Sequence, residues 1–270
     1  MTVAEIHGKI SETSGNVSER MEDLLTSDVF GPMRYLRPQE ILIPFLETAK
    51  SEHGDSFPVL GETVKIHCSF WPSLKSPGCI PCEPDVLLGL ETDGSVIDLV
   101  LIEAKYYSGL SSEEDERPEP NDQLARELDN LCGLSSSDLG WTPGLRVGRR
   151  WLLFVTQDMG MPHGLLAQSL AAYRRKRKRD GDIYWTSWRF LPSILEQALE
   201  KGGSPQSTAV LEDMLQLLLR KGLTVFRGME PIREYLVLPE FYHSSSRSYT
   251  WPDIPDTVRI DYTYEVTNEG

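Results

Sequence analysis

Two apolar segments, residues 86–90 and 96–102, are separated by a short polar connection that contains Asp93 and Gly94. An Asp-Gly pair between two apolar runs is a strong signal for a β-hairpin, because these residues tolerate the backbone conformations that tight turns need. The pattern therefore predicts two adjacent antiparallel strands.

Apolar residues that recur every three or four positions predict a first helix beginning near Asn16 or Ser18. Its apolar stripe consists of Val17, Met21, Leu24 and Leu25. The same criteria predict further helices at residues 38–49, 121–133, 164–179, 192–199 and 211–219, and further strands at 57–70, 150–156, 183–190 and around 225. The strand at 150–156 is almost entirely apolar, which is typical of a parallel strand buried on both faces.

Charged residues lie at the outer ends of the predicted hairpin. Side chains in a strand alternate between faces, so Glu103 and Lys105 project from the same face. If Asp85 lies opposite Glu103, two carboxylates and an ammonium group converge, which is costly unless a cation lies between them. Oxygen ligands of this kind indicate Mg²⁺ or Mn²⁺. The alternative interpretation is a simple ion pair between Glu103 and Lys105 on an edge strand.

The register of the hairpin decides whether Asp85 and Glu103 can meet. A two-residue turn at Asp93-Gly94 would place Asp85 opposite Ile102, on the wrong face. One extra residue, in a three-residue loop or a β-bulge, would place Asp85 opposite Glu103. We therefore expect such an irregularity between the two acids.

Pro84-Asp85 and Glu103-Ala104-Lys105, on two strands followed by a helix and a strand, resemble the motif of the PD-(D/E)xK nuclease superfamily. The resemblance implies an α/β fold with a restriction endonuclease-like core: a helix, three mostly antiparallel strands, a helix and a strand. It also implies Mg²⁺-dependent hydrolysis of DNA phosphodiesters. Asp85, Glu103 and the Ala104 carbonyl would bind the metal, and Lys105 would orient or activate the attacking water.

Two further positions are candidates for the same site. Superfamily members carry a glutamate on the first helix, in a Glu-Arg pair that Glu19-Arg20 resembles, but helical phase aims Glu22 better at a packed sheet. We favour Glu22, and Glu40 and Glu47 are alternates. Gln123 matches a glutamine used by exonuclease-like members, although Glu127 stands where those members have tyrosine.

The predicted core spans residues 16–200. Residues 1–15 are polar, and we expect them to be flexible. Residues 201–205 form the best candidate linker. Residues 206–270 are then a C-terminal α+β extension of unknown role, rich in aromatic residues.

The chain of 270 residues contains 27 basic and 41 acidic residues, a net charge of −14, so we expect weak non-specific DNA affinity. One basic run could bind the DNA backbone, serve as a nuclear-localisation-like signal or end a helix in solvent: Arg174, Arg175, Lys176, Arg177, Lys178 and Arg179. We favour the DNA interpretation. The acidic body suggests a subunit of a larger complex, of the antiviral-defence type, or a homo-oligomer. A catalytically inactive nuclease-fold scaffold or binding subunit is the competing function.

The four cysteines do not predict a disulfide framework. Cys79 and Cys82 could bind zinc or part of an iron–sulfur cluster, or could simply be small residues in a turn. No apolar run is long enough to cross a membrane, and the N-terminus lacks the pattern of a secretion signal. We therefore expect a cytoplasmic protein with no membrane association.

Overall fold

The computed structural model describes residues 17–58, 63, 65–92, 95–107, 109–112, 115–116, 118–141, 144–177 and 181–225, with side chains from Met21 onward. The predicted flexible N-terminus, and residues 226–270 of the predicted extension, lie outside this part of the chain. Every structural statement below refers to the described residues.

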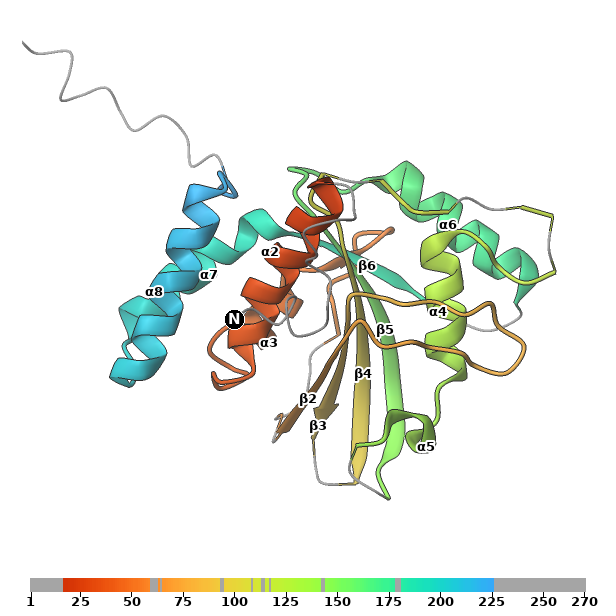
Figure 1. Cartoon of the computed structure of the whole chain (residues 1–270), viewed down its shortest axis with the longest axis horizontal. Coiled ribbons are helices and arrows are strands. Elements are labelled where there is room, and N and C mark those ends of the chain that lie inside the picture. The colour runs from red at the N-terminus through yellow and green to blue at the C-terminus, as the bar shows by residue number, and fades with distance from the viewer. Residues whose placement is uncertain are drawn as a thin grey trace, which may run out of the picture. The chain divides into compact units, whose positions relative to one another are not determined.

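A mixed six-stranded sheet forms the centre of the fold, in the order β1-β6-β5-β4-β3-β2. The strands are β1 (Lys50–Ser51), β2 (Lys65–Phe70), β3 (Val86–Glu91), β4 (Val96–Ala104), β5 (Arg146–Thr156) and β6 (Ile183–Ser187). The β2-β3-β4 half is antiparallel, whereas β5 is parallel to both β4 and β6. The sheet thus changes from antiparallel to parallel pairing at β4 (Figure 1).

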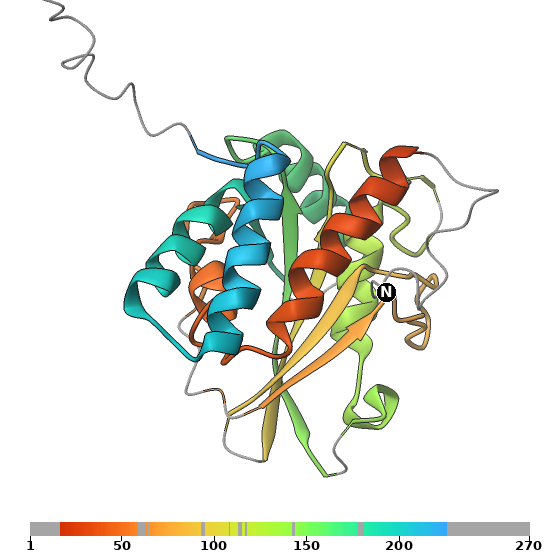
Figure 2. The ribbon, with the colours of Figure 1, turned by 60° about the vertical axis from the view of Figure 1, so that its left-hand side comes forward.

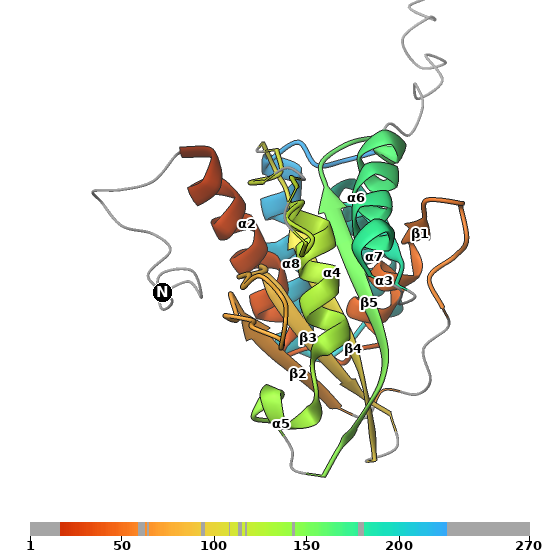
Figure 3. The ribbon, with the colours of Figure 1, turned by 90° about the vertical axis from the view of Figure 1, so that its right-hand side faces the viewer.

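Helices cover both faces of the sheet (Figure 1). They are α2 (Val17–Met33), α3 (Leu42–Glu47), α4 (Gln123–Gly133), α5 (Ser136–Leu139), α6 (His163–Lys176), α7 (Leu191–Lys201) and α8 (Pro205–Arg220), with a 3₁₀ turn at Trp188–Phe190. Figure 2 shows α2, α7 and α8 side by side over one face. Figure 3 shows α4 and α6 beside β5 on the other face.

The alternation of side chains along β4 explains this layered packing. Val100, Ile102 and Ala104 belong to the core beneath α2, α3, α7 and α8. Leu99 and Leu101 belong to the second core, beneath α4 and α6. A strand buried on both faces needs a continuous apolar sequence, which is what this segment has.

The predicted α/β class is confirmed, and α2, β2, β3, β4, α4 and β5 follow one another in the predicted types and order. The helix expected at 38–49 is present as the shorter α3, and the short strand β1, which was not predicted, lies between α3 and β2. The strand expected at 57–70 is shorter, because β2 begins at Lys65. The strand expected at 183–190 ends at Ser187, whose side chain accepts a hydrogen bond from the Arg189 amide and begins the 3₁₀ turn.

The predicted linker at 201–205 is a turn between two packed helices. The Ser204 side chain accepts a hydrogen bond from the Ser207 amide and caps α8. Leu211, Met214 and Leu218 of α8 join the same core as α2 and α7. The expected boundary therefore does not separate two cores, because α8 completes the helical layer over the sheet. No strand is present at Val225.

None of the helices in the described part of the chain has the length and apolar character needed to cross a membrane. The apolar residues of the longest helix pack in the hydrophobic core instead, as Leu25 and Phe30 of α2 do.

Candidate active site

The β3–β4 hairpin has the register that brings Asp85 and Glu103 together. The strands pair regularly from Val86 opposite Ile102 to Glu91 opposite Ile97. The Thr92 amide then donates to the Val96 carbonyl over 3.3 Å, which leaves three residues for the connection. Asp85, immediately before β3, consequently faces Glu103. The predicted extra residue is confirmed, in the form of a three-residue loop.

Lys105 bridges two carboxylates at the end of β4. Its Nζ lies 2.8 Å from Glu103 Oε1 and 3.0 Å from Glu22 Oε1. Burial alone would lower the pKa of Lys105, but the charges of Glu103, Glu22 and Asp85 outweigh burial and hold it above its ordinary value. Lys105 is therefore a charged ammonium group that neutralises part of a buried acidic cluster.

Asp85 is buried and held by two donors. Its Oδ2 accepts a hydrogen bond of 2.8 Å from the Ala104 amide, and its Oδ1 accepts one of 3.2 Å from the indole of Trp71. Burial first, and then the charge of Glu103, raise the pKa of Asp85 well above its ordinary value. Burial and the charge of Glu127 do the same to the pKa of Glu103.

Glu22 reaches the site from α2. Its Oε1 contacts Lys105, and its Oε2 accepts a hydrogen bond of 3.0 Å from the Tyr106 amide. The alternate Glu40 instead pairs with Arg37, and Glu47 is exposed. The side chain of Glu19 lies outside the described residues. The structure thus brings to the site the acid that helical phase favoured.

Gln123, the first residue of α4, links the acids to the loop that follows β4. Asp122 caps the helix by accepting a 3.0 Å hydrogen bond from the Ala125 amide. The Gln123 Nε2 group donates to Glu103 Oε1 over 2.5 Å, and Gln123 Oε1 accepts from the Ser111 amide over 2.7 Å. Gln123 therefore fixes the orientation of the Glu103 carboxyl group.

Glu127 is a site residue that sequence reasoning missed. It lies one turn after Gln123, whose Nε2 also donates to Glu127 Oε1 over 3.2 Å, and only 1% of its surface is exposed. Its Oε2 accepts no hydrogen bond from the described residues. Burial raises the pKa of Glu127 to about 8. An acid within the apolar stripe of Leu124, Leu128 and Leu131 was the signal in the sequence.

The donor set suits a hard divalent cation. Glu22, Asp85, Glu103 and Glu127 share the ammonium of Lys105, so the buried cluster has more acidic than basic groups. A carboxyl group with an unbonded buried oxygen has the oxygen chemistry that Mg²⁺ and Mn²⁺ prefer. Among the described side chains, no three His, Cys, Asp or Glu residues form a ready-made metal cluster. Lys105 and Gln123 contact the same Glu103 oxygen.

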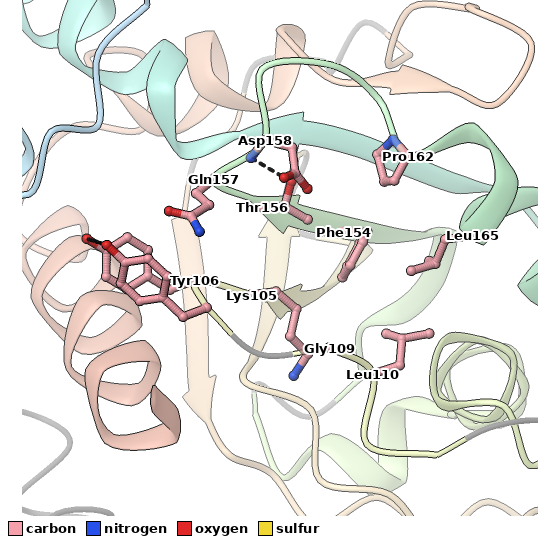
Figure 4. Close-up of a pocket in the computed structure, with 11 residues that line it drawn as sticks. Lys105, Tyr106, Gly109, Leu110, Phe154, Thr156, Gln157, Asp158, Pro162 and Leu165 are labelled. Carbon is pink, nitrogen blue, oxygen red and sulfur yellow. Dashed lines mark hydrogen bonds between the residues drawn. The ribbon is translucent and has the colours of Figure 1, made fainter. Parts of the chain in front are cut away.

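A cavity of about 280 Å³ opens beside Lys105, at the carboxyl ends of β4 and β5. Figure 4 shows Lys105 extending toward Gly109 and Leu110, with Gln157 and Asp158 across the hollow. In open α/β sheets, ligands bind beyond the carboxyl ends of the strands. The acidic cluster therefore lies next to a space that a substrate can enter.

The basic run does not form one uniform surface. The Arg177 guanidinium makes two 2.7 Å contacts with the Asp129 carboxylate and binds the Gly78 carbonyl. Lys176 donates to the main-chain carbonyls of Asp115 and Glu119. These two side chains therefore connect α6 to neighbouring segments, and DNA binding by the six residues stays a prediction.

The remaining basic side chains at the end of α6 are more open. Arg174 lies 3.5 Å from the exposed Asp182, and Arg175 lines a second hollow beside α6. Lys178 and Arg179 lie outside the described residues. Arg175 is thus the member of the run that faces a hollow near the candidate site.

The cysteines are free thiols. The Cys79 thiol contacts the carbonyl oxygens of Pro77 and Asp129 at 3.8 and 3.7 Å. Burial raises the pKa of Cys79 to about 11 and that of Cys82 still further. Two thiols are fewer than the four ligands of a structural zinc site, and among the described residues no further His, Cys, Asp or Glu completes such a group around them.

Comparisons with protein-family models, with curated proteins and with solved structures found no match to this chain. The resemblance to the PD-(D/E)xK motif therefore depends on the residues themselves. Their arrangement, with Asp85, Glu103 and Lys105 at adjacent strand ends, is what supports a function.

Proposed function

We propose that this protein is a metal-dependent nuclease of PD-(D/E)xK type that hydrolyses phosphodiester bonds in DNA. One observation carries the proposal: a three-residue connection sets the hairpin register so that Asp85 lies opposite Glu103, with Lys105 2.8 Å from the latter. A simple ion pair between Glu103 and Lys105 on an edge strand would not require Asp85 nearby, and its side chains would not need to be buried. Here β4 is a central strand, and Asp85 and Glu103 are both buried.

Asp85, Glu103 and the Ala104 carbonyl would hold Mg²⁺ or Mn²⁺, which would supply Lewis-acid chemistry at the scissile phosphate. Lys105, charged at neutral pH, orients the attacking water and offsets negative charge that develops on the phosphate oxygens. Glu22 holds the Lys105 ammonium in place from the side of α2. Gln123 keeps the Glu103 carboxyl group in one orientation.

In this reaction the water oxygen forms a bond to phosphorus, and the bond from phosphorus to the leaving oxygen breaks. The attacking water gives up one proton and the leaving oxygen takes up one, so the products are a phosphate monoester and a hydroxyl group. The side chains contribute mainly by position and charge, as is general for phosphoryl transfer. The net charge of −14 is unfavourable for binding DNA. A partner subunit or a second copy of the chain therefore supplies part of the contacts with the DNA backbone.

A cleavage assay tests the proposal. Supercoiled, linear and single-stranded DNA, together with an RNA oligonucleotide, are incubated with the full chain in Mg²⁺, Mn²⁺ or EDTA. We expect cleavage with either metal, none in EDTA, and none with Glu103→Gln. Glu91→Gln is the matched control, because Glu91 pairs with His67 at the opposite end of β3, and it should cut normally.

The scaffold function predicts a different result. If the wild-type protein, alone and with its co-purifying partners, cuts no nucleic acid with either metal, the fold serves binding instead of catalysis. Cleavage by Glu103→Gln at the wild-type rate would show that the activity comes from a contaminant or from another site.

A further inference from the structure

The cavity beside Lys105 has two chemically distinct sides. Leu110 and Leu165 give it an apolar wall, and Gln157 and Asp158 line its polar side (Figure 4). A nucleobase combines the same features, since its faces are apolar and its edge carries hydrogen-bonding groups. Bases that have left the stack are bound in this way, between apolar or aromatic side chains and polar groups at their edges.

The size of the cavity limits what can enter it. A volume of about 280 Å³ is near the lower limit of small-molecule pockets. It has room for one nucleoside, whereas a base pair with both its backbones needs a groove much wider than this. A nucleotide whose base enters this cavity must therefore be unpaired.

A second hollow continues from the first along α6. The two share Gly109, Leu110 and Leu165 in their walls, and the second extends past Gln168 to Arg175. On α6, residues 165, 168, 171 and 175 follow helical spacing and therefore form one stripe. The helix rises about 15 Å over this distance, which is the span of about four nucleotides at the spacing of about 3.4 Å between stacked bases, and of fewer in an extended strand.

An exposed aromatic side chain lies at the Lys105 end of this path. Tyr107 lines the cavity, yet 58% of its surface is exposed, and its ring centroid is 4.1 Å from that of Tyr106. The exposed part of such a ring is available to stack on a base. Arg175 places positive charge at the far end of the path, where a phosphate would lie, and at the near end Lys105 lies beside the acids that we propose to bind the metal.

We propose that the nucleic acid is bound as a single strand that runs along α6, with one unpaired nucleotide in the Lys105 cavity, a base stacked on Tyr107 and a phosphate at Arg175. This inference rests on the proposed nuclease function, because it names the substrate class of the same site.

Equilibrium binding of fluorescent oligonucleotides tests it, with single-stranded DNA, single-stranded RNA and a duplex of the same sequence. The protein is full-length wild type in EDTA and Glu103→Gln in Mg²⁺. We expect single strands to bind at least about tenfold more tightly than the duplex. Tyr107→Ala should weaken single-strand binding by about tenfold, as loss of one base stack does. Arg175→Gln should lower the slope of log affinity against log salt by about 0.7.

Two substitutions of the same types serve as controls away from the path. Tyr35→Ala removes a tyrosine that is 79% exposed, and Arg37→Gln removes a charge that is 79% exposed, both just after α2. Neither should change single-strand affinity or its salt dependence. Equal affinity for duplex and single strands, equal effects of test and control variants, or no binding to any oligonucleotide would each overturn the inference.

Failure of the inference and failure of the nuclease function give different results. Metal-dependent cleavage with no preference for single strands keeps the nuclease and removes the single-strand path. Preferential single-strand binding that depends on Tyr107 and Arg175, with no cleavage in any metal, keeps the path and removes the nuclease.

Discussion

Asp98 and Glu103 are buried carboxylates on the same strand, β4, but their surroundings are opposite. Asp98 is held by one residue, Arg149, whose amide, Nε and Nη2 groups donate to it over 2.7, 3.0 and 2.8 Å. Glu103 shares the ammonium group of Lys105 with Glu22. The charge of Glu127 raises the pKa of Glu103, and the charge of Glu103 raises the pKa of Asp85.

Asp98 is thus an acid held by its own ion pair, whereas Glu103 is the acid that we propose to act in catalysis. At Asp98 several donors satisfy one acid, so the pair gains nothing from an added cation. At Glu103 several acids depend on one ammonium group, and the pKa values of Asp85 and Glu103 are raised because burial and the neighbouring carboxylates disfavour their charged forms. Raised carboxyl pKa values beside a cavity are typical of catalytic and metal sites.

Replacing the basic partner of each acid, Lys105 or Arg149, should give the largest difference in cleavage rate. We expect Lys105→Ala to lower the cleavage rate by about 100- to 1,000-fold, because the charge that stabilises the transition state is lost. Arg149→Ala should leave the rate within about twofold, since distant sites act independently. Initial rates on a labelled DNA, with thermal melting as a check on folding, measure both. Equal losses in the two variants would mean that Lys105 acts only through the fold.

Glu127→Gln should stabilise the protein, and increasingly so as pH rises. Burial raises the pKa of Glu127 from 4.5 to about 8, so the folded form retains a proton that the unfolded chain loses. The free energy of unfolding of the wild type therefore falls as pH rises from about 4.5 to about 8. The Glu127→Gln variant does not lose this stability, because glutamine does not titrate. We expect no gain near pH 4 and a gain on the order of a few kcal/mol at pH 9. Urea unfolding in EDTA at several pH values measures it, and a gain that does not depend on pH contradicts the assignment.

Asp98→Asn should lower the free energy of unfolding, by less than Glu127→Gln raises it at pH 9. The amide keeps the shape but loses the charge that Arg149 binds, so we expect a loss of about 1–2 kcal/mol near pH 7. Urea unfolding of this variant, of Arg149→Gln and of the double variant gives the coupling energy. A stabilised Asp98→Asn protein would remove the contrast between the two acids.

The sequence was most informative where local periodicity fixes geometry. Strand alternation alone showed that Asp85 and Glu103 could meet only if the connection held an extra residue, and the hairpin has it. Helical phase likewise selected Glu22 over Glu19, and Glu22 contacts Lys105. Both inferences needed only the period of one element and the face that it buries.

The periodicity of single elements does not predict which side chains far apart in the sequence pair with one another. The basic run is continuous in sequence, but Arg177 is bound by Asp129, 48 positions earlier. Glu127 was interpreted as a departure from a tyrosine motif, although its place on the buried face of α4 makes it part of the acidic cluster. The packing of α8 on α7 was also hidden, because a Gly-rich turn and a linker have the same composition.

The contact between Glu22 and Lys105 has a consequence for how the chain acquires its site during synthesis. The two residues are 83 positions apart, and Glu22 also binds the Tyr106 amide. Contacts of such high sequence separation form late, because the entropy of closing the intervening loop must first be overcome. Gln123 and Glu127 follow still later in the chain. An emerging or partly unfolded chain therefore carries its acids dispersed, and their assembly reports that α2, the hairpin and α4 have docked together.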